Sequence, residues 1–262
     1  MSITLLGAGH HLHAARRIDG YSSCVHRAEL RAPDGGTLTA YVKAFPSSKE
    51  SKALANEIAG YLLARACGLS TAPRAFILLI HVRKLRKLFP EYTWPGGDDD
   101  LFPTWATEEL QDSKLTLVSE ADAIAWRQRV QQWTQLPAAI TFHQWLQNID
   151  ANAGNLLWLG ESDFALIDYA DILGGQDWTA DSLKTAGYLH NKLLHLAYGG
   201  VPDPASANAI EESHQFASQA WAQEKGTIID WWDDLLKRKE AAAAAEFIES
   251  RSSADWIKGK VA

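Results

Sequence analysis

Cysteine is scarce in this chain, with two cysteines among 262 residues. Cys24 and Cys67 stand far apart, lack the spacing of metal ligands and have no secretory context. A disulfide framework and a cysteine metal site are therefore not expected. We expect both thiols to be reduced and buried.

Long apolar segments are also missing. No run approaches the ~20 apolar residues that cross a bilayer, and the N-terminus lacks the charged-then-apolar order of a signal peptide. We therefore expect a soluble cytoplasmic protein without a membrane span.

Positive charge is outnumbered, because 25 basic residues stand against 32 acidic residues and give a formal net charge of −7. This balance argues against general nucleic-acid binding. The basic segment 81–87 is a local exception. We interpret it as a solvent-exposed helix face in preference to a contact with a phosphate-rich partner or a membrane surface.

Two familiar kinds of ligand motif are absent or incomplete. Neither G-x-G-x-x-G nor G-x-x-x-x-G-K-[ST] occurs, which argues against an ordinary α/β nucleotide-binding fold. His10, His11 and His13 cluster near the N-terminus without a carboxylate or cysteine framework. A flexible polar segment is therefore favoured there over a metal site.

The chain is long enough for one large domain or for two lobes that share a cleft. A polar, turn-rich stretch over residues 90–113 divides it, and we place an inter-lobe hinge in Leu101–Glu108. We predict an α+β chain with a small β-rich N-lobe, residues 1–108, that contains one main helix, and a mostly helical C-lobe, residues 109–262. The helices expected in the second part span residues 120–133, 138–147, 182–198, 205–224, 227–238 and 240–257.

Three polar residues near the middle of the chain, Asp150, Asn155 and Asp168, bracket two short apolar runs. In a kinase site one Asp accepts the proton of the acceptor hydroxyl, an Asn after four intervening residues holds a metal ion, and a later Asp holds the metal that bridges the nucleotide phosphates. The three residues can fill these roles in that order. Turn composition alone also favours Asp and Asn, but a carboxylate at the end of an apolar strand must be neutralised or solvated, and a metal ion neutralises it well.

The two apolar runs predict a β-hairpin. Asn155–Leu159 and Phe164–Ile167 are separated by Gly160–Asp163, which has turn composition. In an antiparallel hairpin, residues equally far from the turn lie opposite each other, which brings Asn155 beside Asp168. One amide and one carboxylate, completed by nucleotide phosphates, suit a Mg²⁺ site.

A lysine on a strand and an acidic residue on a helix precede this set. Lys43 lies in an alternating segment, residues 37–45, and Glu57 lies within a predicted helix over residues 49–67. In a kinase, Lys43 would contact the α- and β-phosphates of ATP and Glu57 would hold it extended through an ion pair. Taken singly, Lys43 is more simply interpreted as a lysine on an edge strand, and Glu57 as an exposed charge on a helix.

A weaker candidate for a phosphate-covering turn lies ahead of the first predicted strand. Gly20, Ser22 and Ser23 are small residues that let backbone amides approach an anion. We therefore include them among the expected nucleotide-binding residues.

With these residues in place, the chain resembles the HipA-like kinases, an offshoot of the protein-kinase-like fold that is close to the phosphatidylinositol kinases. The resemblance covers roughly residues 18–200 and rests on Tyr41–Lys43, Ala55–Leu69, Asn148–Leu157 and Leu166–Tyr169. It implies a two-lobed kinase-like fold, ATP and Mg²⁺ as cofactors, a protein Ser/Thr acceptor, a toxin-like or regulatory role and an antitoxin-like regulator. By position it makes Asp150 the catalytic aspartate, Asn155 and Asp168 the metal ligands, and Lys43 and Glu57 the nucleotide-anchoring pair.

The chain also departs from these kinases at several positions. Related kinases place Arg or His beside the catalytic Asp, where this chain has Ile149 and Ala151, and Tyr169-Ala170 stands where Phe-Gly is common. Our leading hypothesis is transfer of the γ-phosphoryl group of ATP to a hydroxyl. The alternatives are a catalytically weak kinase-like binding or scaffold protein, a lipid or small-molecule kinase, and nucleotidyl transfer.

Overall fold

The computed structural model describes residues 3–18, 23–46, 50–110, 114–115, 123–187 and 190–260. The chain divides into two compact units. Unit 1 comprises residues 1–54 and 72–111, and unit 2 comprises residues 55–71 and 112–262. Strands dominate unit 1 and helices dominate unit 2. The predicted α+β class, with a β-rich N-terminal part and a mostly helical C-terminal part, is therefore confirmed.

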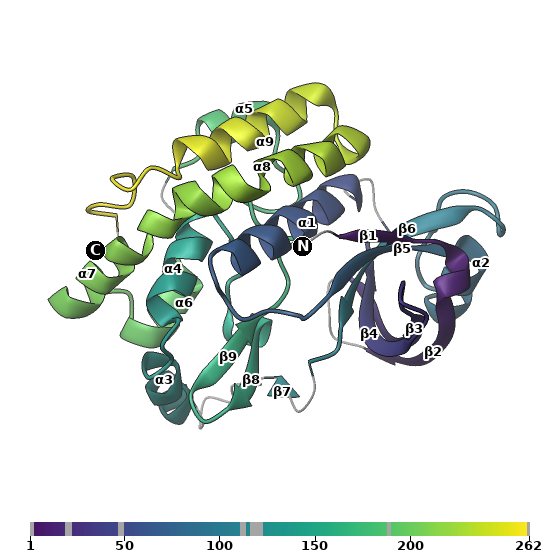
Figure 1. Cartoon of the computed structure of the whole chain (residues 1–262), viewed down its shortest axis with the longest axis horizontal. Helices are drawn as coiled ribbons and strands as arrows, with labels where there is room; N and C mark the ends of the chain where they lie inside the picture. Colours follow the sequence, from purple (N-terminus) through teal and green to yellow (C-terminus); the bar gives the residue numbers. More distant parts are fainter. Residues whose placement is uncertain are drawn as a thin grey trace. The chain divides into compact units, whose positions relative to one another are not determined.

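Unit 1 is built around a curled six-stranded sheet with the order β1-β5-β6-β4-β3-β2 (Figure 1). β1 runs parallel to β5, and the other neighbouring strands are antiparallel. The described elements of this unit are β1 (Thr4–Leu6), η1 (Ala8–His10), β2 (His11–Ile18), β3 (Cys24–Arg31), β4 (Thr37–Ala44), β5 (Ala75–His81), α2 (Val82–Leu88) and β6 (Leu101–Glu108).

Strand β4 of the β3–β4 hairpin coincides with the alternating segment that the sequence predicts over residues 37–45. Buried and more exposed positions alternate along β4, which is the period of a strand with one face on a core. In the turn, Gly35 has a φ of 87°, a conformation that glycine adopts without a steric penalty, and its N–H donates to Ala32 O at 3.0 Å. Lys43 lies near the end of β4, opposite Val25 and Trp105.

The hinge predicted over Leu101–Glu108 is wrong, because this segment is strand β6 in the interior of the sheet. Turn-forming residues before the strand and Pro103 within it conceal it in the sequence. Pro103 has no N–H to donate, but it lies opposite Leu79 of β5 and beyond the register with β4, which covers residues 105–108. Proline is tolerated there because β4 does not pair with that part of β6.

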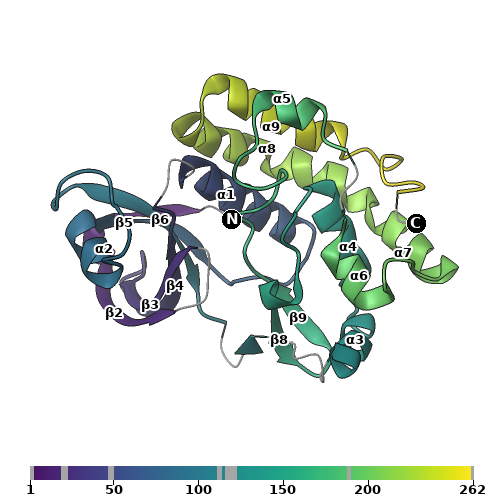
Figure 2. The same cartoon turned by 180° about the vertical axis from the view of Figure 1, so that it is seen from behind.

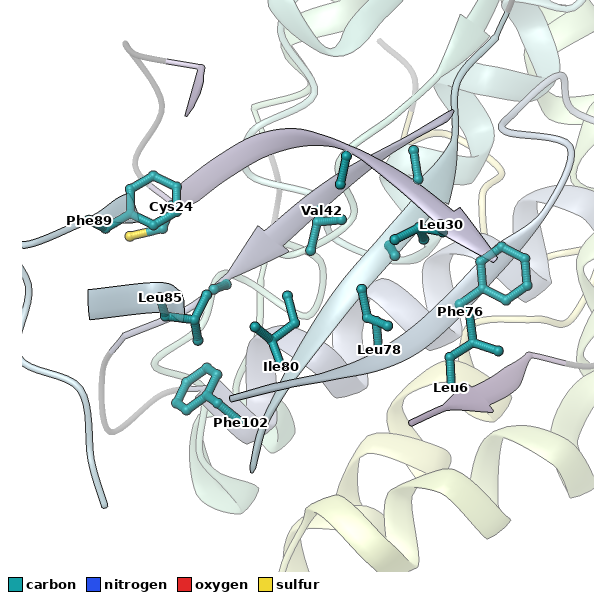
Figure 3. Close-up of a cluster of buried hydrophobic side chains, with 14 of the residues drawn as sticks. Leu6, Cys24, Leu30, Val42, Phe76, Leu78, Ile80, Leu85, Phe89 and Phe102 are labelled. Carbon is teal, nitrogen blue, oxygen red and sulfur yellow. The ribbon is translucent and has the colours of Figure 1, made fainter. Parts of the chain in front are cut away.

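The core of unit 1 is formed by apolar side chains that converge from the sheet. In Figure 3, side chains from β1, β3, β4, β5 and β6 point towards a common interior, and two residues from the α2 region lie at one end. The labelled members are Leu6, Cys24, Leu30, Val42, Phe76, Leu78, Ile80, Leu85, Phe89 and Phe102.

The flexible polar segment expected around His11 is also wrong. His11 belongs to β2 and is buried, and its Nε2 lies 3.1 Å from Nε2 of the buried His26. The Nζ of Lys84 on α2 lies 3.3 Å from His11 Nδ1 and donates to His11 O at 3.1 Å. The histidine therefore belongs to the packed sheet.

The two cysteines form no disulfide. Cys24 is buried as expected, whereas Cys67 is partly exposed. Burial raises the pKa of both thiols to about 12, so neither is a thiolate near neutral pH.

Unit 2 combines a small sheet with a set of helices. Its three-stranded sheet has the order β7-β8-β9, and α8 and α9 lie side by side (Figures 1 and 2). None of the helices within the described residues has the length and apolar character to cross a membrane. The described elements are the greater part of α1 (Glu50–Ala66), β7 (Lys114–Leu115), α3 (Ala123–Gln131), α4 (Leu136–Trp145), η3 (Ala153–Asn155), β8 (Leu156–Gly160), β9 (Asp163–Leu166), α5 (Ala180–Lys184), α6 (Lys192–Tyr198), α7 (Pro204–Ser213), α8 (Gln215–Leu235) and α9 (Arg238–Ser250).

Three expected helices of unit 2 are divided differently from the prediction. The segment 182–198 contains the end of α5, a break and α6, which restarts where the Asn191 side chain accepts the N–H of Leu194 at 3.0 Å. The break expected near residue 225 instead falls at His214, between α7 and α8. The buried His214 ring is held by the backbone oxygen of Arg251 at 2.8 Å, a tertiary contact that no local pattern signals.

Candidate functional site

The predicted β-hairpin is present in unit 2 as β8 and β9. Its register pairs Leu156 with Leu166, and the N–H of Ile167 donates to Asn155 O at 3.1 Å. Asn155 therefore lies opposite Ile167, and Asp168 is the next residue along the chain. The hairpin brings the backbones of the two predicted metal ligands to the same end.

Asp150 and Asn155 are joined directly. Asn155 Nδ2 donates to Asp150 O at 2.6 Å and lies 3.2 Å from Asp150 Oδ2. Asn152, to which the sequence assigned no role, donates from Nδ2 to Asp150 Oδ1 at 2.8 Å and caps η3 by accepting the N–H of Gly154 at 2.7 Å. The short loop thus fixes the Asp150 carboxylate through two amide side chains.

Lys192 is a site residue that the sequence did not reveal. It is the first residue of α6, and its Nζ lies 2.9 Å from Asp150 Oδ1. The two residues are 42 positions apart. No local spacing could therefore have signalled the pair.

Asp168 lies in the left-handed region of backbone conformation, with a φ of 66°. Asp and Asn enter this region more readily than most residues. The next N–H, of Tyr169, donates to Oε2 of the buried Glu57 on α1 at 3.0 Å. Glu57 therefore holds the backbone next to Asp168. The simpler interpretation of Glu57 as an exposed helix charge is wrong, because the residue is buried.

A second side chain on α1 holds the segment that follows Asp168. Asn56 Nδ2 lies within hydrogen-bond distance of three backbone oxygens, those of Ala170 at 2.7 Å, Ile172 at 3.0 Å and Gly175 at 3.1 Å. Its Oδ1 accepts from Trp178 Nε1 at 3.2 Å. Asn56 is fully buried. One amide of α1 thus fixes the path of residues 170–178.

The start of the Asp150 loop rests on a buried histidine. Asn148 Oδ1 accepts the N–H of Asp150 at 2.9 Å, and Asn148 Nδ2 lies 3.2 Å from Nδ1 of His143 on α4. Burial lowers the pKa of His143 to about 3, so its ring is neutral and can accept this hydrogen bond. His143 and Asn148 thus tie the backbone of Asp150 to helix α4.

The donor set suits a magnesium ion better than a transition metal. Within the described residues there is no group of three or more His, Cys, Asp or Glu side chains that could hold a metal. Asn155 is buried and its Nδ2 is engaged by Asp150, so its Oδ1 could serve, with the carboxylate of Asp168, as an oxygen ligand of a metal ion. One amide and one carboxylate fit Mg²⁺ when phosphates complete the shell.

Of the other predicted nucleotide-binding residues, Lys43 and Ser23 belong to unit 1. Lys43 is a half-buried residue of β4, and Ser23 immediately precedes β3. Gly20 and Ser22 lie outside the described residues. Glu57 belongs to unit 2, so its ion pair with Lys43 stays a prediction.

Comparison with known proteins leaves the family open. No family model matches the chain, and no curated protein matches it. Among solved structures, it aligns with the FAT and kinase domain of CtTel1 at 11% identity and a TM-score of 0.37, covering 95% of this chain and 22% of that chain. It aligns with the open conformation of CtTel1 at 11% identity and a TM-score of 0.37, covering 93% of this chain and 12% of that chain.

A third alignment, with the complete CtTel1 dimer with C2 symmetry, has 10% identity and a TM-score of 0.37, and covers 95% of this chain and 12% of that chain. The chain thus spans less than a quarter of the length of each of these three structures. At these scores the similarities do not indicate a function. The function proposed below is based on the geometry around Asp150.

Proposed function

We propose that the chain is an ATP-dependent kinase that transfers the γ-phosphoryl group of ATP to a hydroxyl acceptor and requires Mg²⁺. The observation that carries this proposal is the arrangement in unit 2 of Asp150, hydrogen-bonded to Asn155, and Asp168, which follows the residue paired with Asn155. Gln147 and Leu173 also have positive φ values, of 50° and 59°, in the two segments that flank this arrangement. Such strained residues gather at functional sites.

Asp150 acts as the proton acceptor in this reaction. The acceptor oxygen attacks the γ-phosphorus, the bond from that phosphorus to the β–γ bridging oxygen breaks, and ADP leaves. The hydroxyl proton passes to the Asp150 carboxylate, which later releases it to water. The side chain of Asp150 is 41% exposed, so an acceptor hydroxyl can reach it.

Asn155 Oδ1 and the Asp168 carboxylate would hold Mg²⁺, which when bound supplies neutralising charge to the phosphates. In the first unit, Lys43 would contact the α- and β-phosphates of ATP. Gly20, Ser22 and Ser23 would cover them. Glu57 holds the turn at Asp168 through Tyr169 N and would also anchor Lys43.

The acceptor we propose is a Ser or Thr hydroxyl of a protein, which is what the resemblance to HipA-like kinases implies, with an antitoxin-like protein as a regulator. A lipid or another small alcohol is the alternative within the same reaction class. Incubation of the protein with γ-labelled ATP and a cell lysate, followed by separation of protein from lipid, assigns the label to one of these acceptors.

The first prediction concerns Asp168→Asn. Asparagine tolerates the same positive φ, so the turn is kept while the negative charge is lost. We expect γ-phosphoryl transfer at saturating ATP and Mg²⁺ to fall about 100-fold or more. Asp163→Asn, on the exposed first residue of β9, is the matched control and should retain wild-type transfer. An Asp168→Asn variant that transfers phosphate at the wild-type rate would contradict the proposed function.

A kinase-like binding protein without efficient chemistry is the second candidate. The ammonium of Lys192 already contacts Asp150, the residue that has to accept a proton. This candidate predicts that ATP with Mg²⁺ raises the thermal midpoint of the protein while no label reaches any lysate component. Transfer that is lost in Asp168→Asn excludes it.

A further inference from the structure

Lys192 is held in place by the start of its helix. Asn191, the buried N-cap of α6, accepts the N–H of Leu194 at 3.0 Å and donates from Nδ2 to the backbone oxygen of Ile140 on α4 at 2.9 Å. The helix therefore begins at a fixed point against α4. The fold thus places the backbone of Lys192, from which its side chain reaches Asp150.

The loop that carries Asp150 supplies no positive charge of its own. Residues 151–154 are Ala, Asn, Ala and Gly. The ammonium group beside Asp150 comes from Lys192 on another element.

The two oxygens of Asp150 have unequal environments. Oδ1 accepts from Asn152 Nδ2 at 2.8 Å and from Lys192 Nζ at 2.9 Å. Among the residues that the structure describes, Oδ2 has one amide contact, with Asn155 Nδ2 at 3.2 Å, which is the long end of the hydrogen-bond range. Oδ1 is thus committed to two donors, whereas Oδ2 keeps a lone pair for a further donor.

We propose that Lys192 is a positioning residue for phosphoryl transfer that, together with Asn152, holds Oδ1 of Asp150 and presents Oδ2 to the acceptor hydroxyl. The inference rests on the proposed kinase function and assigns the proton to one atom. When the acceptor oxygen attacks the γ-phosphorus, its proton moves to Oδ2. The ammonium of Lys192 keeps all of its protons and remains on Oδ1.

The test is the steady-state kinetics of Lys192→Met and Lys192→Arg. The probes are casein as a protein acceptor, with γ-labelled ATP, and water as an acceptor in ATP hydrolysis. Because small losses of alignment cost large factors in rate, we expect kcat of Lys192→Met to fall about 100-fold with KM for ATP little changed. Lys192→Arg, which keeps a charged donor, should recover most of this loss. Lys184→Met, on an exposed lysine of α5 that pairs with Asp181, is the matched control and should behave as wild type.

Each contrary outcome has a separate meaning. Wild-type kcat in Lys192→Met, or a rise in KM for ATP at constant kcat, overturns the positioning role and leaves the kinase function standing. Failure of Lys192→Arg to recover kcat also overturns it. A wild-type protein that transfers no phosphate to casein or to water overturns both proposals. If Lys192→Met does not fold, Lys192→Gln is measured in its place and is expected to lose kcat in the same way.

Discussion

A single glycine fixes the distance between α1 and the turn that carries Asp168. A Cβ at Gly60 would lie 2.2 Å from Tyr169 Cβ and 2.4 Å from its Cγ. The Tyr169 side chain is buried, and its hydroxyl lies 3.0 Å from Thr71 Oγ1 and 3.2 Å from Leu166 O. The tyrosine therefore has no room to withdraw from a larger residue.

The second prediction follows from this contact. Gly60→Ala should lower the free energy of unfolding by about 3 kcal/mol, because overpacking in a rigid core outweighs the better helix propensity of alanine. Gly226→Ala, in α8, is the matched control, since nothing lies within 4 Å of the added Cβ. It should raise the stability by about 1 kcal/mol. Urea denaturation followed by circular dichroism measures both, and an equally stabilised Gly60→Ala would refute the steric argument.

At the residue scale, the sequence predicts the parts of the site that are close together in the chain. The spacing of Asp150 and Asn155 and the apolar runs before Asp168 depend on short-range rules of loops and hairpins. Lys192 and Asn56 could not be predicted in the same way. Lys192 follows its partner Asp150 by 42 positions, and Asn56 precedes its partner Ala170 by 114 positions. Tertiary packing brings these pairs together, and such packing gives no local pattern in the sequence.

At the scale of elements, α1 organises the segment after Asp168. Asn56 and Glu57, which are adjacent on this helix, bind backbone groups between residues 169 and 175. Gly60 lies one turn further along and contacts Tyr169. One face of the helix therefore sets the path of the chain next to the candidate metal ligand.

The third prediction tests this role with Asn56→Asp. The change is nearly isosteric, but it replaces the amide donor with an oxygen that faces three backbone oxygens in a buried site. We expect a loss of more than about 3 kcal/mol in the free energy of unfolding. Amide hydrogen exchange of residues 170–176 should also become faster.

The control for this change is Asn208→Asp, on an exposed position of α7. Its stability and its hydrogen exchange should match the wild type. Unchanged protection of residues 170–176 in Asn56→Asp would show that other contacts hold the segment.

Elements with a clear period or turn are predictable here, and those that depend on distant partners are not. The β3–β4 and β8–β9 hairpins follow from alternation and turn composition. β6 has the composition of a hinge loop because of Pro103 and the turn residues that precede it, whereas its pairing with β5 and β4 depends on the rest of the sheet. The break at His214 likewise depends on Arg251, 37 positions away.

At the scale of the whole molecule, buried neutral histidines make stability depend on pH. Burial lowers the pKa of His26 and His143 to about 3 each, and burial together with the charge of Lys84 lowers that of His11 to about 4. Below about pH 6.5 these histidines bind protons in the unfolded chain but stay neutral in the folded chain. Stability therefore decreases as the pH falls from about 6.5 towards the folded-state pKa values.

The fourth prediction isolates one of these histidines. At pH 5, proton uptake at an unfolded-state His143 costs the folded state about 2 kcal/mol relative to pH 7. His143→Gln removes the titration and should reduce the loss of stability between pH 7 and pH 5 by about that amount. Urea denaturation at the two pH values measures each difference.

The contacts of α1 also constrain the order in which the chain can fold during synthesis. Trp232 donates from Nε1 to the backbone oxygen of Ala55, a partner 177 residues earlier. At about 5–20 residues per second, a ribosome takes roughly 10–35 s to make the intervening chain. Ala55, Asn56 and Glu57 are all fully buried in the finished protein. Ala55 awaits Trp232 for that time, whereas Asn56 and Glu57 await partners at residues 169–178 for roughly two thirds of it. Slow translation would therefore prolong exposure of the helix face that later shapes the site, and this face is where we expect a nascent-chain chaperone to bind.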